Sequence, residues 1–218
     1  AVVSGKEQYA RLDLARSRAA GLRSRVIENL DKYLIEFETN FIKRGGKIIW
    51  AQDAEEANKE ILALLKAKGV SEVVKSKSMI TEEIHLNAAL KKEGINSVET
   101  DLGEFIQQTD GEAPYHIVTP AMHKSKEDVA RLYASKLGAP ADMTPEEVTE
   151  WTRKHLRDKF RKAGAGITGA NFLVAETGSV ALTENEGNVW MSVAAPKLHI
   201  VVAGIEKIIP TLTDLDIF

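Results

Sequence analysis

Apolar residues in the first part of the chain recur at steps of three and four positions. The recurring residues are Leu22, Val26, Leu30, Tyr33, Leu34, Phe37 and Phe41. This spacing places them on one face of a helix and predicts one long amphipathic helix that ends at Gly45-Gly46. We expect the apolar face to pack on a core or on a second subunit. The alternative is a helix that lies on a membrane surface.

Short apolar runs alternate with helical patterns over the middle of the chain. The apolar runs predict strands at residues 47–50, 72–75, 96–99 and 115–118. The helical patterns cover residues 53–68, 81–92, 125–137 and about 144–163. Asp53 with Glu56 three residues on, and Thr144 followed by Pro145, are typical helix starts. Such alternation is typical of the α/β class, in which helices cover both faces of a mostly parallel sheet.

The last third of the chain has a different pattern. Its apolar runs lie at residues 171–175, 179–183, 189–193 and 198–203, with little room for helices between them. They predict late antiparallel strands, as hairpins or meanders at one side of the sheet. Before them, Gly164-x-Gly166-x-x-Gly169 has the spacing of a dinucleotide fingerprint, but that fingerprint requires a preceding strand and a following helix. Here the order is reversed, so we interpret the segment as a turn between a helix and a strand.

The composition is that of a globular protein. Of the 218 residues, 44% are hydrophobic and 28% are charged, and the net charge is -3. No apolar run is long enough to span a bilayer, and this charge balance does not favour a nucleic-acid partner. The chain has no cysteine, which excludes a thiol nucleophile and a cysteine-bound iron–sulfur cluster within this polypeptide. The histidines show no compact ligand spacing, so we predict no metal site.

Polar residues follow four of the predicted strands. They are Lys77 and Ser78, Glu99 and Asp101, Thr119 and His123, and Glu176, Thr177 and Gly178. Open α/β sheets bind ligands beyond the carboxyl ends of their strands, so we expect these residues to share one pocket. Lys77 and Ser78 are candidates to hold an anion. Glu99, Asp101 and Glu176 are candidate catalytic acids or bases. For each residue alone, a helix cap or a surface ion pair is the alternative.

A polar segment lies between two of the late predicted strands. It contains Asn185, Glu186, Gly187 and Asn188. Asn and Gly are turn formers, so one interpretation is a plain hairpin turn. The other is a loop that projects over the pocket as part of the ligand-binding site. In that case the backbone amides around Gly187 and Gly178 would donate hydrogen bonds to an anion.

Several strings of the sequence, in this order, resemble the LUD domain of the lactate-utilisation proteins. They are KSKSMITEEI at 75–84, ETDLGE at 99–104, HIV at 116–118, GITGANF at 166–172, AETGS at 175–179, NEGN at 185–188 and GIEK at 204–207. The resemblance runs from about Arg16 to the end of the chain. So many ordered matches make it specific for the family.

The resemblance implies a NagB/RpiA/CoA-transferase-like α/β fold. It implies an N-terminal helical segment at residues 1–45 and a LUD α/β domain at 46–218, truncated at its C-terminal end. The implied activity is the oxidation of L-lactate to pyruvate in the bacterial cytoplasm, with a small anionic ligand and with lactate-utilisation proteins A and C as partners. Full-length members carry [4Fe–4S] clusters on a further cysteine-containing region, so we expect no cofactor in this chain. An oligomer is left open.

Two further functions fit the same residues. The first is a non-catalytic docking or structural subunit of the lactate-oxidising complex, whose redox chemistry belongs to its partners. The second is an enzyme of the CoA-transferase or sugar-phosphate isomerase kind, which would use Glu176 as its nucleophile or base.

Overall fold

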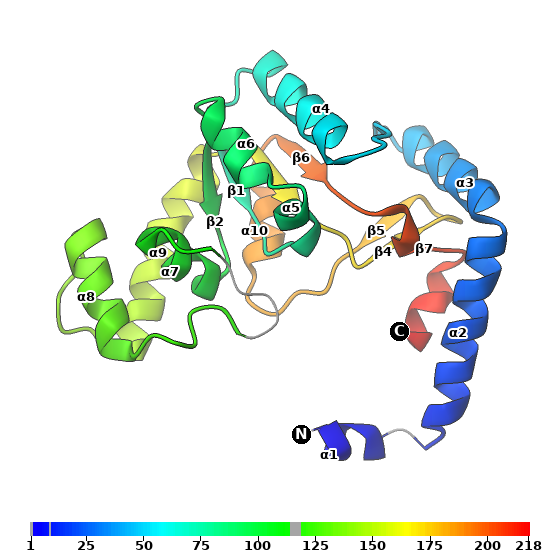
Figure 1. The fold of residues 1–218 in the computed structure, drawn as a ribbon, viewed down its shortest axis with the longest axis horizontal. Helices are drawn as coiled ribbons and strands as arrows, with labels where there is room; N and C mark the ends of the chain where they lie inside the picture. Colours follow the sequence, from blue (N-terminus) through cyan, green and yellow to red (C-terminus); the bar gives the residue numbers. More distant parts are fainter. Residues whose placement is uncertain (1, 9, 114–118) are drawn as a thin grey trace. The chain divides into compact units, whose positions relative to one another are not determined.

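The computed structural model describes residues 2–8, 10–113 and 119–218 and has the α/β fold that the sequence predicts (Figure 1). The chain forms two compact units. The first comprises Ala1–Ile49, Ala170–Leu182 and Ala203–Phe218, and the second comprises Trp50–Gly169 and Thr183–Val202. The predicted strand at 115–118 lies outside the described residues.

The second unit is built on a parallel four-stranded sheet in the order β2-β1-β3-β6 (Figure 1). Its strands are β1 (Glu72–Lys75), β2 (Asn96–Glu99), β3 (Ala165–Thr168) and β6 (Leu198–Val201). The strands predicted at 72–75 and 96–99 are confirmed. In the register, Lys75 of β1 is paired with Glu99 on one side and with Ile167 on the other. Because the strands are parallel, their carboxyl ends meet at one edge of the sheet.

Helices cover both faces of this sheet. They are α4 (Ala54–Ala67), α5 (Met79–Glu83), α6 (Leu86–Lys92), α7 (Leu102–Asp110), α8 (Lys126–Leu137), α9 (Pro145–Lys162) and α10 (Asn188–Ala194). Successive side chains of a strand point to opposite faces, so Val73 and Val74 belong to different cores. Val73 packs in a cluster with Leu65 of α4, and Val74 in a cluster with Phe105 of α7. The prediction of a helix-covered parallel sheet is therefore confirmed.

The helix starts that the sequence predicts are confirmed at three N-termini. The Asp53 side chain caps α4 by accepting a hydrogen bond of 2.9 Å from the backbone N–H of Glu56. Ser125 at α8 and Thr144 at α9 each form a complete capping box with the acidic residue three positions on. Such caps satisfy backbone donors that the helix itself leaves unpaired.

The sequence predicted a turn at Gly164-x-Gly166-x-x-Gly169, but this segment contains β3, one of the two inner strands of the sheet. Its glycines allow close packing. A Cβ atom on Gly166 would lie 1.8 Å from the backbone oxygen of Ser192 in α10, and one on Gly169 would lie 2.7 Å from Ser78 Oγ. The spacing therefore reflects backbone contacts of a buried strand rather than a cofactor fingerprint.

Three other predictions in the second unit are wrong in their local detail, and one helix was not predicted. The late strand predicted at 198–203 is β6, but it pairs parallel with β3 rather than antiparallel. The helix predicted at 81–92 is divided into α5 and α6, because His85 between them has a left-handed φ of 55°. The strand predicted at 189–193 is helix α10, whose first turn is bonded to the Glu184 carboxylate through the N–H of Trp190. Helix α7 was not predicted, although Asp101 caps it by accepting from the N–H of Glu104.

The first unit combines helices with a small mixed sheet. Its elements are α1 (Val2–Glu7), α2 (Leu12–Glu28), α3 (Leu30–Lys43), β4 (Phe172–Val174), β5 (Ser179–Ala181), η1 (Ile205–Lys207), β7 (Ile208–Ile209) and η2 (Leu212–Ile217). Strand β4 pairs antiparallel with β5, as predicted, and parallel with β7, which was not predicted. Val26 and Phe37 pack with Leu173 and Ile208, so the apolar face of the N-terminal helices packs on a core.

The predicted single N-terminal helix is two helices. Asn29 between α2 and α3 has φ -132° and ψ 37°, and its side-chain Nδ2 donates to the backbone oxygen of Arg25 at 2.9 Å. Asn side chains compete in this way for backbone groups and disfavour helix interiors. The strand predicted at 47–50 is irregular, and Ile49 and Trp50 are exposed.

Candidate functional site

A buried network of charged side chains lies at the carboxyl ends of β1 and β2. Lys75 ends β1, and its side chain is fully buried. Its Nζ lies 2.9 Å from Glu82 Oε1 and 3.1 Å from Glu99 Oε1, and it donates to Thr81 Oγ1 at 3.1 Å. Glu99 ends β2, whereas Thr81 and Glu82 come from α5. The sheet register therefore places Lys75 beside Glu99, and the following helix supplies the other partners.

Lys75 keeps its charge because carboxylates surround it. Burial alone lowers the pKa of Lys75, but the charges of Glu99, Glu82 and Glu104 outweigh it and raise the pKa above its ordinary value. A buried ammonium is costly unless it is paired in this way. The polar pattern after β1 pointed to Lys77 and not to Lys75, although a lysine directly after two buried valines signals such a position.

Glu104, on the first turn of α7, is the second residue of this network that was not predicted from the sequence. Burial, and then the negative charge of Glu99, raise the pKa of Glu104 to about 8, while Lys75 acts in the opposite direction. A hydrogen bond between Glu104 and Glu99 also raises this pKa. At neutral pH the Glu104 carboxyl is therefore mostly protonated and donates to Glu99. The pattern of Asp101 followed by Glu104 is a helix-start signal that could have located it.

Glu99 is held by further polar contacts. Its Oε1 accepts a hydrogen bond of 2.7 Å from Asn87 Nδ2 of α6, and Ser97 Oγ donates to Asn87 Oδ1 at 2.9 Å. Its backbone N–H donates to Gln108 Oε1 at 3.0 Å. These contacts position one carboxyl oxygen beside Lys75 and the carboxyl group beside Glu104. Glu99 and Glu104 together form a donor and acceptor pair for a proton.

Asp101 and Glu186, both predicted site residues, are brought together at the start of α7. Partial burial, and then the charge of Asp101, raise the pKa of Glu186, whereas a hydrogen bond from the backbone N–H of Leu102 lowers it. The two carboxyl groups are hydrogen-bonded to each other. The segment at 183–187 therefore reaches the N-terminal end of α7. This gives the edge of the sheet a second pair of neighbouring carboxyl groups.

The segment that contains Thr119 also packs on the first turn of α7. A Cβ atom on Gly103 would lie 2.8 Å from the backbone oxygen of Pro120, so Gly103 permits this contact. Thr119 itself is exposed. His123 lies elsewhere, because its Nε2 is 3.0 Å from Glu112 Oε2, beyond the C-terminal end of α7. The two ends of this nine-residue helix are about 13 Å apart, so His123 is not brought to Asp101.

Lys77 and Ser78 follow β1 at the same edge. Lys77 is exposed, whereas Ser78 is only 6% exposed. Among the described residues, Ser78 Oγ has no hydrogen-bond partner, and it faces the backbone of Gly169 at the end of β3. Buried hydroxyl groups are usually hydrogen-bonded, so this one offers a bond to a bound group. An exposed cation and a buried hydroxyl are therefore adjacent in the chain at the carboxyl ends of β1 and β3.

The backbone amides predicted to donate to an anion are bonded to Glu184. Its Oε1 accepts from the N–H groups of Asn185, Glu186 and Gly187 at 3.0, 3.0 and 2.9 Å, and its Oε2 accepts from that of Trp190 at 2.9 Å. Burial opposes ionisation, but these bonds lower the pKa of Glu184. Asn188 Oδ1 accepts from the N–H of the next residue. The segment therefore caps α10 with its own carboxylate.

The remaining predicted residues belong to the first unit, in the turn between β4 and β5. Gly178 has φ 61°, and a Cβ atom there would lie 2.4 Å from the backbone nitrogen of Phe41 in α3. Its N–H donates to the oxygen of Val174 at 2.8 Å. Glu176 Oε2 accepts from the N–H of Leu212 at 3.2 Å, and Thr177 is partly buried. That Glu176, Thr177 and Gly178 share a site with Glu99 stays a prediction.

A metal cofactor needs several donor side chains grouped in space. In the described ranges, no three or more His, Asp or Glu side chains are grouped to hold a metal ion. An iron–sulfur cluster needs thiolate ligands, and the chain has no cysteine, so its residues do not fit such a cluster. None of the helices described combines the length and the apolar character that crossing a membrane requires.

Comparisons with known proteins give a consistent result. The model of the LUD domain family matches residues 34–217. Lactate utilization protein B of Lysinibacillus sphaericus is 46% identical over 203 residues, which cover 93% of this chain and 43% of the relative. Lactate utilization protein B of Bacillus cytotoxicus is 47% identical over 196 residues, which cover 90% and 41%. In Escherichia coli K12, a relative named Uncharacterized electron transport protein YkgF is 45% identical over 202 residues, which cover 93% and 42%.

The chain spans less than half the length of these curated relatives. No solved structure matches it.

Proposed function

Because the chain belongs to the LUD domain family, we propose that it is the α/β domain of a lactate-utilisation protein that takes part in the oxidation of L-lactate to pyruvate. The support for this role is the identity of 46% over 203 residues with a relative named Lactate utilization protein B. A cytoplasmic location and an oxidoreductase complex with lactate-utilisation proteins A and C belong to the same proposal.

We further propose that the carboxyl edge of the parallel sheet binds a small carboxylate, L-lactate or pyruvate. One observation carries this proposal: Lys77 is exposed next to the buried hydroxyl of Ser78, which faces Gly169 and has no hydrogen-bond partner in the part of the chain that the structure describes. The ammonium group of Lys77 would attract the carboxylate, and Ser78 would donate a hydrogen bond to it.

The carboxyl pair of Glu99 and Glu104 would hold or accept a proton near this ligand. Lactate oxidation releases protons as well as electrons, and a carboxyl group whose pKa lies near neutrality exchanges protons readily. The electrons would pass to a redox group outside this chain, such as an iron–sulfur cluster elsewhere in the complex.

Isothermal titration of the purified chain with L-lactate and with pyruvate tests the proposed site. We expect Lys77→Ala to weaken binding by about tenfold or more, because one charge-assisted contact contributes about 1.5–3 kcal/mol. Lys59→Ala is the matched control, since Lys59 is an exposed lysine on α4 of the same unit. Absence of binding by the unaltered chain, or equal weakening by both substitutions, would contradict the site.

A docking role is the second candidate, and exposed apolar residues on the N-terminal helices favour it. Ile27 of α2 is 72% exposed, and Ile35 and Ile42 of α3 are 63% and 52% exposed. Ile35 and Ile42 are seven residues apart and so lie on the same face of α3. Contiguous exposed apolar surfaces are typical of sites that bind partners. In a pull-down, a docking subunit would capture proteins A and C without lactate. Ile35→Glu would reduce the amount of A and C that is captured, whereas Lys68→Glu in the second unit would not. The docking role would be contradicted if capture of A and C required lactate, or if Ile35→Glu left the captured amount unchanged.

A further inference from the structure

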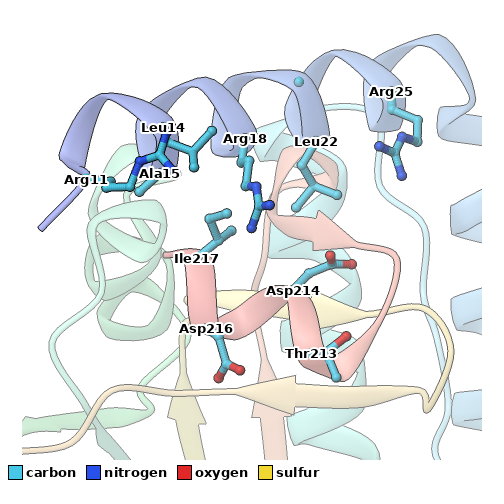
Figure 2. Close-up of a pocket in the computed structure, with 11 residues that line it drawn as sticks. Arg11, Leu14, Ala15, Arg18, Leu22, Arg25, Thr213, Asp214, Asp216 and Ile217 are labelled. Carbon is cyan, nitrogen blue, oxygen red and sulfur yellow. The ribbon is translucent and has the colours of Figure 1, made fainter. Parts of the chain in front are cut away.

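The first unit contains a cavity of about 700 Å³ between α2 and η2 (Figure 2). Its lining residues are Arg11, Leu14, Ala15, Arg18, Gly21, Leu22, Arg25, Thr213, Asp214, Asp216 and Ile217. Small-molecule sites have volumes of roughly 300–1,000 Å³. The cavity is therefore of the size of an organic cofactor and is far larger than a three-carbon acid such as lactate.

Arg18 and Arg25 of α2, with Arg11 at its N-cap, line one wall of the cavity. Arg18 and Arg25 are seven residues apart, which places them on one face of the helix about 10 Å from each other, and Arg11 precedes the first helical residue. Figure 2 shows Arg18 and Arg25 pointing from the helix towards the η2 segment. Among the described residues, none of the three arginines forms an ion pair. Unpaired guanidinium groups that face a cavity match the fork geometry of phosphate oxygens.

The opposite wall is supplied by η2. Asp214 is already bonded, because its Oδ2 accepts from the N–H and the hydroxyl of Thr211, both at 2.8 Å. Asp216 is exposed beside it and is available to accept hydrogen bonds from uncharged donors of a ligand. Three arginines against two aspartates leave an excess of positive charge in the cavity. The net charge therefore favours an anion.

Apolar side chains complete the lining. Leu14 and Leu22 of α2 and Ile217 of η2 face the same space as the arginines (Figure 2). A simple inorganic anion would use none of this apolar surface. A ligand with both phosphates and an apolar ring would use the arginines and the apolar residues together, and its hydroxyl or amino groups would reach Asp216.

We propose that this cavity binds a phosphate-bearing organic ligand of the nucleotide class. The phosphates lie along Arg18 and its neighbouring arginines, and the ring packs on Leu14 and Ile217. The site is independent of the carboxylate site proposed above, because all of its residues belong to the first unit.

Isothermal titration with ATP, tripolyphosphate and adenosine as probes tests this assignment. We expect ATP to bind, and tripolyphosphate to bind more weakly because it lacks the ring. Adenosine should bind at least tenfold more weakly than ATP because it lacks the phosphates. Arg18→Ala should weaken ATP binding by about tenfold or more, and added salt should weaken it further. Arg16→Ala is the matched control, since Arg16 is exposed on the same helix outside the cavity.

Circular dichroism and the melting temperature establish that both variants are folded before they are titrated. The proposal is overturned if the unaltered chain does not bind ATP, or if adenosine binds as tightly as ATP. It is also overturned if Arg16→Ala weakens binding as much as Arg18→Ala. Lys77→Ala, in the other unit, should leave ATP binding unchanged.

Discussion

The substitution Glu104→Gln tests the buried carboxyl pair through the pH dependence of stability. The folded chain raises the pKa of Glu104 from 4.5 to about 8, first through burial and then through the charge of Glu99. The folded state therefore binds this proton more tightly than the unfolded state does. The contribution of Glu104 to the free energy of unfolding is complete below pH 4.5 and is lost as the pH rises to about 8. Gln has the same shape and no proton to lose.

The size of the effect follows from the pKa difference. At about 1.4 kcal/mol per pKa unit, the rise from 4.5 to about 8 corresponds to a loss of about 5 kcal/mol over this range. At neutral pH the loss is about 3 kcal/mol, because Glu104 is then still mostly protonated in the folded state. The side-chain amide that the substitution introduces avoids this loss while it keeps a donor towards Glu99.

Urea unfolding followed by circular dichroism measures the difference. We expect the variant and the unaltered chain to have similar free energies of unfolding near pH 4.5. Near neutral pH the variant should be more stable by about 3 kcal/mol, and by more near pH 8.5. Glu83→Gln is the control, since Glu83 is an exposed carboxylate on α5 of the same unit. A difference that does not change with pH, or a variant that is less stable at high pH, would refute the reasoning.

Further substitutions test the packing and the caps, each by urea unfolding. Lys75→Met should destabilise the fold by about 3–5 kcal/mol, because it leaves two carboxylates without their buried cation; a loss below about 1 kcal/mol would argue that the network is solvated. Gly166→Ala should destabilise by at least about 1–3 kcal/mol, because its Cβ would meet the backbone of Ser192. Gly21→Ala, where nothing lies within 4 Å, should instead stabilise α2 by about 0.5–1 kcal/mol; equal effects would count against the packing argument. Thr144→Ala should cost about 1 kcal/mol through the lost cap of α9, and an unchanged stability would be inconsistent with the capping box.

The candidate site was predicted in part. Asp101 and Glu186 were selected from the sequence, and they meet at the start of α7. Glu99 was also selected, but as an isolated acid or base rather than as a member of a buried network. Lys75 and Glu104 were missed because their role depends on burial. A lysine at a strand end and a glutamate in a first helical turn are ordinary surface residues until other elements cover them.

Local signals in the sequence determined the helix starts at Asp53, Ser125 and Thr144, the strands at 72–75 and 96–99, and the α/β class. These depend on capping and on the period of apolar residues, which act within a few positions. Only the tertiary structure decided that residues 165–168 form an inner strand of the parallel sheet and that residues 188–194 form a helix. The glycine-rich segment is extended because neighbouring strands and α10 approach it closely, and the apolar run before Pro196 is helical because the Glu184 carboxylate caps it. Contacts between distant segments override local propensity at such positions, since a short segment has only weak preferences of its own.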